Sequence, residues 1–239
     1  LTRLHLGDFS QNITHLEELY DFYSGTEWAS HAISKYSDNQ TYSYEHYEPV
    51  FELTEPHGTL HFLVVDSQGN AVGMTTTVNL LFGLLVYDNT TGIVLNNEMD
   101  DFSVPLSPNA FNLTPSVFNY VSGHRRPLSS TSPTVIVSDG IPELVIGAAG
   151  GLRITTAVFH AIVCILKENV PLLETIAAPR LHHQLIPEFV MAENFTVINE
   201  EFDEDVIDGL RSKNHTFWES GTLTVMNGIQ RVKIAEGYI

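Results

Sequence analysis

The chain has 239 residues, a hydrophobic fraction of 43% and a mean hydropathy of +0.02, which are values typical of a globular protein. Eleven Lys and Arg residues stand against 29 Asp and Glu residues, so the formal net charge is -18. A surface this negative repels phosphate backbones and anionic headgroups, and we therefore expect no nucleic-acid or membrane-surface partner.

The single cysteine, Cys164, excludes an internal disulfide and lies in an apolar run, where we expect a buried packing role. We expect neither a membrane-spanning stretch nor a signal peptide in this chain. It begins at Leu1 rather than at a methionine, which suggests a fragment whose targeting segment was removed.

Glycosylation acceptor patterns are more frequent than the roughly one or two expected by chance. The candidates are Asn12, Asn39, Asn89, Asn112, Asn194 and Asn214. This excess favours a glycoprotein of the secretory pathway, at the cell surface, extracellular or vacuolar, and an N-terminal segment absent from this chain could anchor it.

The first part of the chain predicts short helices. Thr14 and Glu17 have capping-box spacing, Gly25 breaks that helix, and Thr26 can cap a second one. Residues 42–51 then read as an extended, tyrosine-rich stretch.

From residue 59 the pattern changes to strands. Residues 59–66 and 71–81 predict a hairpin. A short strand follows at 93–95, and residues 102–123 read as a long loop, which in compact domains is usually functional.

The remaining elements alternate between strands and helices. Residues 134–137 and 143–146 predict a second hairpin, a helix runs from Gly150-Gly151 to about Lys167, and another runs from Pro171 to Ala178. Closing strands are expected near Val197, at 222–226 and at 231–234. The order predicts a sheet covered by helices, in the mixed α/β (α+β) class.

The pair Gly58-Thr59 at the start of the first strand has a possible chemical role. An N-terminal threonine supplies both a nucleophilic hydroxyl and a free α-amine that can accept the proton. Taken alone, a Gly-Thr pair is more often an ordinary turn entering a strand.

Further motifs follow in a fixed order. They are Thr77 with Asn79, the run Asn-Asn-Glu-Met-Asp-Asp at 96–101, Pro-Leu-Ser-Ser at 127–130 and Gly-Ala-Ala-Gly-Gly at 147–151. In this order the chain resembles the end of the large subunit and the small catalytic subunit of gamma-glutamyltransferase, also called glutathione hydrolase. The resemblance extends from about Tyr42 to the closing Gly237-Tyr238.

The resemblance implies the four-layer αββα sandwich of N-terminal nucleophile hydrolases, partial here because the upstream large subunit is missing. Residues 1–58 would be the C-terminal end of the large subunit, and residues 59–239 the small catalytic subunit. Autocatalytic cleavage would occur at Gly58-Thr59 through an N-to-O acyl shift.

It also implies a role for each motif residue. Thr59 would be the nucleophile and Thr77 the residue that orients it. Glu98 and Asp101 would bind the substrate ammonium, and Ser129 and Ser130 would bind its carboxylate. Asn79 could contact either of these two charged groups. The N–H groups of Gly150 and Gly151 would bind substrate and stabilise the oxyanion.

The implied activity is γ-glutamyl transfer and hydrolysis of glutathione and its S-conjugates through a γ-glutamyl-Thr59 ester. The partners would be glutathione, amino-acid or dipeptide acceptors, and the large subunit of the same precursor. No cofactor or metal is expected, since the adjacent histidines His182 and His183 point to different sides of a strand or helix.

Two alternatives stay open. The chain could be a non-catalytic or processing-incompetent relative with a scaffold role, or a related acylase for another acyl group. Departures from the family pattern are Thr131 after the serine pair and Leu152-Arg153 after the glycine pair. The large-subunit arginine of the family is absent, and Arg125, Arg126 or Arg153 cannot be assumed to replace it.

Overall fold

The computed structural model describes residues 25–48, 58–106, 115–193, 202, 204–234 and 237–238. The helix expected from Thr14 and the strand expected near Val197 lie outside these residues. So do the glycosylation candidates Asn12, Asn112 and Asn194.

The first sheet is the antiparallel hairpin of β1 (Thr59–Val65) and β2 (Ala71–Thr77), as predicted. Its turn is held by the Asp66 carboxylate, which accepts hydrogen bonds from the backbone N–H groups of Gln68 and Asn70. The prediction that the second strand continues to Leu81 is wrong. Asn79 has a φ of 71°, in the left-handed region, so the strand ends at Thr77.

The second sheet has the strand order β10-β6-β5, with β5 at Thr134–Ser138, β6 at Ile141–Ala149 and β10 at Val225–Gln230. All three strands are antiparallel to their neighbours. The second predicted hairpin is therefore confirmed, with a longer β6 than expected. The strand expected at 222–226 begins later, at Val225.

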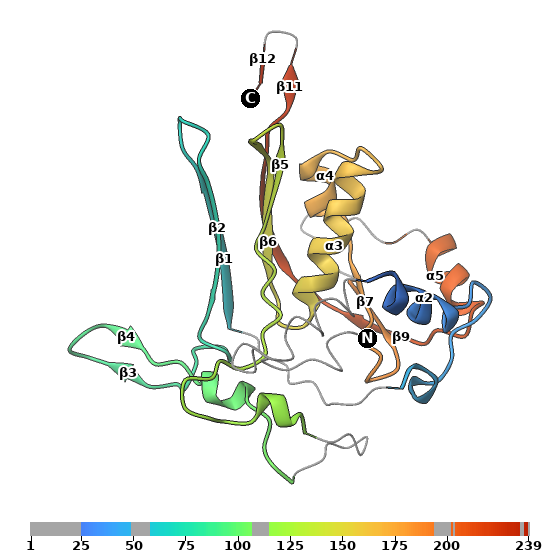
Figure 1. Ribbon diagram of the computed structural model, residues 1–239, viewed down its shortest axis with the longest axis horizontal. Coiled ribbons are helices and arrows are strands. Elements are labelled where there is room, and N and C mark those ends of the chain that lie inside the picture. Colours follow the sequence, from blue (N-terminus) through green and yellow to red (C-terminus); the bar gives the residue numbers. More distant parts are fainter. Residues whose placement is uncertain are drawn as a thin grey trace.

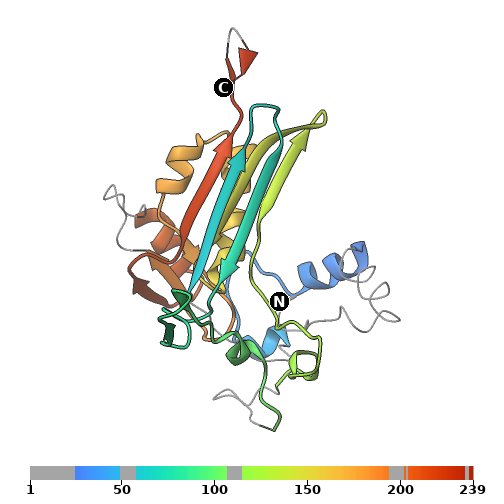
Figure 2. The ribbon, with the colours of Figure 1, turned by 90° about the vertical axis from the view of Figure 1, so that its left-hand side faces the viewer.

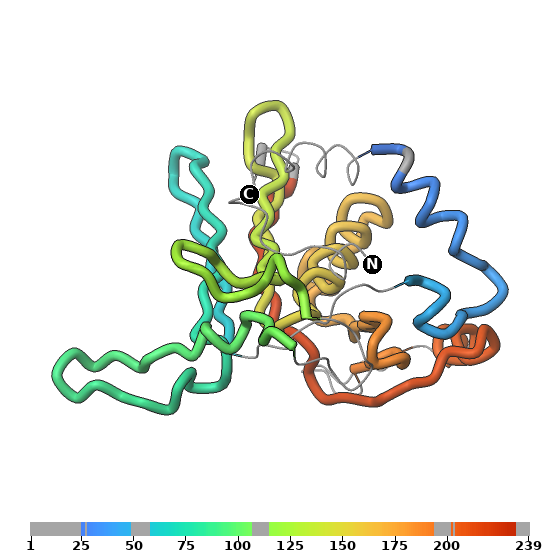
Figure 3. Tube along the Cα trace, turned by 60° about the horizontal axis from the view of Figure 1, so that its bottom comes forward, coloured from blue at the N-terminus to red at the C-terminus, as the bar shows by residue number. Residues whose placement is uncertain are grey.

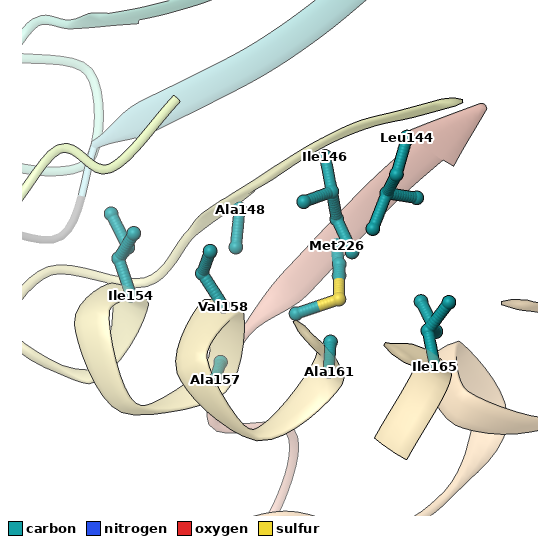
Figure 4. Packing of buried hydrophobic residues seen from close by; sticks show 9 residues of the cluster. All are labelled: Leu144, Ile146, Ala148, Ile154, Ala157, Val158, Ala161, Ile165 and Met226. Carbon is teal, nitrogen blue, oxygen red and sulfur yellow. The ribbon is translucent and has the colours of Figure 1, made fainter. Parts of the chain in front are cut away.

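Helices α3 (Arg153–Leu166) and α4 (Leu172–Ala177) pack on the outer face of this second sheet, as Figure 1 shows. Apolar side chains of β6, α3 and β10 fill the interface (Figure 4), and they are Leu144, Ile146, Ala148, Ile154, Ala157, Val158, Ala161, Ile165 and Met226. The period of 3.6 in α3 places its small and branched residues on one face, which lets the helix lie close to the sheet.

The two sheets pack face to face, with β1 and β2 against β6 (Figures 1 and 2). His61 lies between them and is buried, and its Nδ1 is 2.8 Å from the Thr75 hydroxyl. Gly147 on β6 leaves room for this imidazole, because a Cβ there would lie 2.5 Å from His61 Nε2. The described layers are thus sheet, sheet and helix, consistent with the mixed fold expected.

The other described elements surround these layers. A third sheet, ordered β7-β8-β9, contains Leu181–His182, Val190–Glu193 and Phe217–Ser220. Helices α2 (Thr26–Ser34) and α5 (Glu204–Arg211) and the 3₁₀ helix η2 (Tyr44–Tyr47) lie on that side of the molecule (Figure 1). The remaining short elements are β3 (Tyr87–Asp88), β4 (Ile93–Val94), η3 (Glu98–Asp101), η4 (Val117–Asn119), β11 (Lys233–Ile234) and β12 (Gly237–Tyr238).

Three sequence expectations need correction. The stretch from residue 42 contains the turn of η2 instead of being extended throughout. The described part of the loop at 102–123 contains η4 and a parallel bridge between Ser103 and Tyr120. Cys164 is only partly buried, with its Sγ 3.4 Å from His160 Nε2.

No helix among the described residues combines the length and the apolar character that a bilayer crossing requires.

Candidate active site

A hydrogen-bonded chain joins Thr59 to the peptide bond that precedes it. Thr59 and Thr77 are register partners on β1 and β2, and the Thr59 hydroxyl donates to Thr77 Oγ1 over 3.1 Å. The Thr77 hydroxyl in turn donates to the Gly58 carbonyl oxygen over 3.0 Å. Thr77 is therefore placed to accept the proton of an attacking Thr59 hydroxyl and to polarise the Gly58 carbonyl.

The backbone of residues 78–80 holds Gly58 in place. The N–H of Val78 donates to the Gly58 carbonyl over 2.9 Å, and the Gly58 N–H donates to the Asn79 carbonyl. A Cβ on Gly58 would overlap the Leu80 carbonyl, with its carbon at 2.7 Å. A side chain at this position would therefore displace the segment that fixes the scissile carbonyl.

Asn79 sits beside this chain and is buried. Its backbone N–H donates to Thr77 Oγ1 over 2.9 Å, and its Nδ2 donates to the Asn97 carbonyl over 3.1 Å. Its Oδ1 is buried without a hydrogen-bond partner among the described residues. A buried acceptor left open in this way suits a cationic donor from a ligand.

Asn97 connects the nucleophile to the acidic turn. Its Oδ1 accepts from the Leu80 N–H over 3.0 Å, and its Nδ2 donates to Asp100 Oδ2 over 2.8 Å. The sequence reasoning gave Asn97 no role of its own. The only signal was its place directly before a cluster of acidic residues.

The acidic turn is η3, which presents Glu98 and Asp101 to each other. Asp101 is buried, and its side chain is hydrogen-bonded to that of Glu98. Burial raises the pKa of Glu98, although the hydrogen bond to Asp101 lowers it in part. Glu98 Oε2 is buried without a partner among the described residues. Two facing carboxyl groups of this kind either share a proton or bind a cation.

The segment that carries the serine pair is bound by a third buried asparagine, Asn119. Ser130 is buried and Ser129 exposed, and the Ser129 hydroxyl donates to Thr131 Oγ1 over 3.1 Å. Asn119 Nδ2 donates to the Asp101 carbonyl over 2.8 Å, while its Oδ1 accepts from the Leu128 N–H over 2.9 Å. The serines and the acidic turn are thus joined through Asn119, to which the sequence reasoning also gave no role.

Gly150 and Gly151 form the turn between β6 and α3. Their φ angles are 144° and 63°, which favour glycine. A Cβ on Gly150 would lie 2.7 Å from both the Leu223 carbonyl oxygen and Thr224 Cγ2. The sequence requires glycine here both for the backbone conformation and for the close approach of residues 223–224.

The expected site residues converge to different degrees. The first residue of β1 and the last residues of β2 and β6 lie at the same end of the two packed sheets. The segments that follow β2, green in Figure 3, lie at that end as well. Hydrogen bonds connect Thr59, Thr77 and Asn79 directly, and Asn97 and Asn119 extend the connection to the acidic turn and the serines. Among the described residues, no hydrogen bond joins the glycine pair to Thr59, and the two share only this end of the sheets.

Two of the three arginines considered from the sequence, Arg125 and Arg153, have side-chain contacts with backbone carbonyl groups. Arg153 Nε donates to the Leu223 carbonyl over 3.2 Å, and Arg125 Nη1 lies 3.4 Å from the Val117 carbonyl. The adjacent histidines have separate partners. His182 Nδ1 is 2.8 Å from the Thr156 hydroxyl, whereas the His183 ring packs edge-on against His215.

In this layered α+β fold, a threonine begins a strand, and its hydroxyl is connected through the Thr77 hydroxyl to the carbonyl of the residue before it. This arrangement defines the class of N-terminal nucleophile hydrolases. The chain matches the model of the Gamma-glutamyltranspeptidase family over residues 2–237 and belongs to this family.

Known relatives agree with this assignment. The chain is 38% identical over 207 residues to "Glutathione hydrolase proenzyme 1" of Schizosaccharomyces pombe, covering 87% of this chain and 31% of the relative. It is 39% identical to an Arabidopsis thaliana protein provisionally named inactive glutathione hydrolase 4, covering 71% of this chain and 90% of that protein.

The chain superposes with a TM-score of 0.66 on a crystal structure of an acivicin-inhibited gamma-glutamyltranspeptidase. That structure revealed roles of the protein's C-terminus in autoprocessing and catalysis. It is 34% identical and covers 75% of this chain and 93% of the solved one. The chain spans only about a third of the length of the first curated relative.

Proposed function

We propose that the full-length protein is a γ-glutamyl-transferring and glutathione-hydrolysing enzyme whose nucleophile is Thr59. The observation that carries the proposal is the hydrogen-bonded chain from the Thr59 hydroxyl through Thr77 to the Gly58 carbonyl. These two hydrogen bonds link the nucleophile to the Gly58-Thr59 peptide bond, whose cleavage would make Thr59 an N-terminal residue.

The first reaction would be cleavage at Gly58-Thr59. The Thr59 oxygen attacks the Gly58 carbonyl carbon, the C–N bond breaks, and the acyl group passes to Thr59 as an ester. Water then hydrolyses the ester, leaving a carboxylate on Gly58 and a free α-amine on Thr59. Thr77 would assist by taking up the hydroxyl proton and donating its own to the carbonyl oxygen, and that proton passes to the departing Thr59 nitrogen as the C–N bond breaks.

The second reaction would use the new α-amine as the base. The Thr59 oxygen attacks the γ-carbonyl of glutathione, the amine passes the proton to the departing cysteinylglycine nitrogen, and a γ-glutamyl ester remains. Water releases glutamate, whereas an amino acid or dipeptide acceptor forms a new γ-glutamyl amide. The N–H groups of Gly150 and Gly151 would stabilise the oxyanion in both steps.

The polar residues connected to Thr59 favour a zwitterionic acyl group over one without charged groups. Asp101 is buried, Glu98 beside it is partly buried with its Oε2 atom shielded, and Asn79 Oδ1 is an open buried acceptor, so together they suit an ammonium. Ser129 and Ser130 lie on the segment that Asn119 ties to this pair and can donate to a carboxylate. An acylase for another side chain would have no use for this pairing.

We also propose that an upstream part of the precursor is the protein partner, with the subunit boundary between residues 58 and 59. The support is the outer face of β1 and β2, which is apolar and exposed. Its residues and their exposed fractions are Leu60 57%, Phe62 40%, Val64 58%, Val72 58% and Met74 48%. A large apolar patch of this kind marks an interface.

A secretory-pathway location, at the cell surface, extracellular or vacuolar, remains a proposal. Among the described glycosylation candidates, Asn39, Asn89 and Asn214 are all exposed. Exposure is necessary for modification by a glycan, and treatment of the purified protein with a glycosidase followed by mass measurement tests it.

The central test uses the full-length protein and its Thr59→Ala variant. We expect the wild-type protein to yield a fragment whose first residue is Thr59, and to release product from a γ-glutamyl anilide. The variant should stay a single chain, with activity lower by roughly 10⁴-fold or more. A wild-type chain that stays intact would support the scaffold alternative. Faster release from a glutaryl anilide than from the γ-glutamyl compound would support the acylase alternative.

A further inference from the structure

We infer that Asn119 is a positioning residue that fixes the ammonium-binding and carboxylate-binding halves of the pocket relative to each other. This inference rests on the proposed function and deepens it, because it names a group that touches no substrate and yet sets substrate preference.

The contacts of Asn119 use its whole side-chain amide. The residue is 3% exposed and ends η4. Its Nδ2 donates to the Asp101 carbonyl over 2.8 Å and to the Ser103 hydroxyl over 3.2 Å. Its Oδ1 accepts from the Leu128 N–H over 2.9 Å. Both donors and the acceptor are therefore committed to other segments of the chain.

The backbone of Asn119 is held as firmly. Its carbonyl accepts from the Ser103 N–H over 2.9 Å, and its N–H donates to the Ser116 carbonyl over 2.9 Å. A parallel bridge pairs Ser103 with Tyr120. The amide consequently projects from a fixed backbone, and the positions of its nitrogen and oxygen are set.

The two segments that Asn119 joins carry opposite halves of the proposed pocket. Asp101, whose carbonyl accepts from Nδ2, belongs to the acidic turn. Leu128, whose N–H donates to Oδ1, directly precedes Ser129 and Ser130. One amide thus bridges the acidic turn and the serine pair, which are far apart in the sequence.

This bridge matters because a γ-glutamyl group carries its ammonium and its carboxylate on the same carbon atom. A pocket that binds both must hold its two halves within about 0.5 Å of the productive arrangement. Displacement of one half by about 1 Å can cost about 100-fold in rate even when every contacting residue remains. Asn119 is placed to prevent that displacement.

The test compares Asn119→Ala with wild-type full-length protein, using three competitive inhibitors. Glutamate has both charged groups, glutarate lacks the ammonium, and 4-aminobutyrate lacks the α-carboxylate. In the wild type, glutamate should bind more tightly than either analogue. In Asn119→Ala we expect the KM for a γ-glutamyl anilide to rise about 10- to 100-fold, by analogy with the loss of residues that orient metal ligands in metal sites. The kcat should change less, and the preference for glutamate over both analogues should shrink.

A second variant separates the two arms of the amide. Asn119→Asp keeps an acceptor for the Leu128 N–H but cannot donate to the Asp101 carbonyl. We expect it to weaken the preference for glutamate over glutarate more than the preference over 4-aminobutyrate. If Asn119→Ala does not fold, the Asn119→Asp variant serves as the test of the inference.

The matched control is Asn70→Ala at the far end of the β1–β2 hairpin. It removes a side-chain hydrogen bond from Nδ2 to Asp66 over 2.7 Å, and it should leave KM and the inhibitor preferences unchanged. If the Asn119 variants fold, lose only thermal stability and keep the wild-type preference for glutamate, Asn119 is an ordinary structural residue and the inference is wrong. If wild-type protein neither cleaves the anilide nor prefers glutamate, the proposed function itself fails.

Discussion

Two neighbouring regions of the molecule are held together by different forces. The interface of β6, β10 and α3 consists of closely packed aliphatic side chains, whereas the loops between β2 and β5 are held by the buried amides of Asn79, Asn97 and Asn119. Apolar burial stabilises without fixing directions, while a buried hydrogen bond fixes the position of each atom that it joins. The comparison therefore predicts that changes in the core lower stability and that changes in the loops lower activity.

Among the variants that test this comparison, the largest effect on activity is expected at Gly150. In Gly150→Ala, the new Cβ would meet the Leu223 carbonyl oxygen and Thr224 at 2.7 Å, so the turn must shift. A displaced oxyanion donor costs about 10²–10³ in kcat, which corresponds to about 2.7–4 kcal/mol of activation free energy. Steady-state kinetics with a γ-glutamyl anilide measure this loss.

Gly69→Ala is the matched control for that variant. Gly69 also has a positive φ, of 84°, but a Cβ there would meet nothing within 4 Å. It should reproduce the backbone strain and leave kcat unchanged. Equal kinetic losses in both variants would mean that strain, and not the site geometry, explains the effect of Gly150→Ala.

Glu98→Gln tests the acidic turn. Removing the negative charge should weaken substrate binding by about 1.5–3 kcal/mol, the usual range for a hydrogen bond to a charged group, so KM rises. Because burial raises the pKa of Glu98, the wild-type KM should also rise as the pH falls through that raised value, and the variant should not show this dependence.

Although Glu98→Gln should weaken substrate binding, it should not lower the free energy of unfolding at neutral pH. A carboxyl group with a raised pKa in the folded state contributes stability below its unfolded pKa and loses that contribution as the pH rises through the folded value. At neutral pH the substrate-free Glu98→Gln protein should therefore be at least as stable as the wild type in denaturant unfolding. Glu204→Gln, at an exposed carboxylate of α5, should leave KM unchanged.

A conservative change in the core tests the other half of the comparison. Ile146→Val removes one methylene group from a fully buried side chain and should lower the free energy of unfolding by about 0.5–1.5 kcal/mol. Ile141→Val on the same strand, at a side chain 42% exposed, should cost less. Neither variant should change KM, and a change in KM without loss of stability would contradict the separation of the two regions.

The same contrast explains what the sequence could predict. The apolar patterns of four elements reflect burial, on one face for β1, β2 and α3 and on both faces for β6. The predicted elements are present in the structure, although β2 is shorter and β6 longer than expected. The connecting roles of Asn97 and Asn119 depend on which backbone groups approach them across 17 and 9 residues, respectively. No local pattern encodes such a pairing. Even the end of β2 at Thr77 was missed, because Asn79 adopts a left-handed conformation to meet Gly58.

The smallest effect at neutral pH concerns His183, a partly buried polar group outside the site. Burial and the neighbouring His215 and His182 lower the pKa of His183 to about 4, and its Nδ1 accepts from the Leu185 N–H over 3.0 Å. Protonation would remove that acceptor. Since the unfolded chain takes up the proton near pH 6.5, the stability from neutral His183 is complete above that pH. It is lost progressively as the pH falls toward about 4.

His183→Asn keeps an acceptor for the Leu185 N–H but cannot titrate. We expect its free energy of unfolding to fall less steeply than that of the wild type between pH 6.5 and 4, and its activity at neutral pH to be unchanged. Denaturant unfolding at several pH values measures the slope. Identical slopes would show that His183 does not carry the pH dependence. A loss of activity at neutral pH would show instead that buried hydrogen bonds far from Thr59 also position the site.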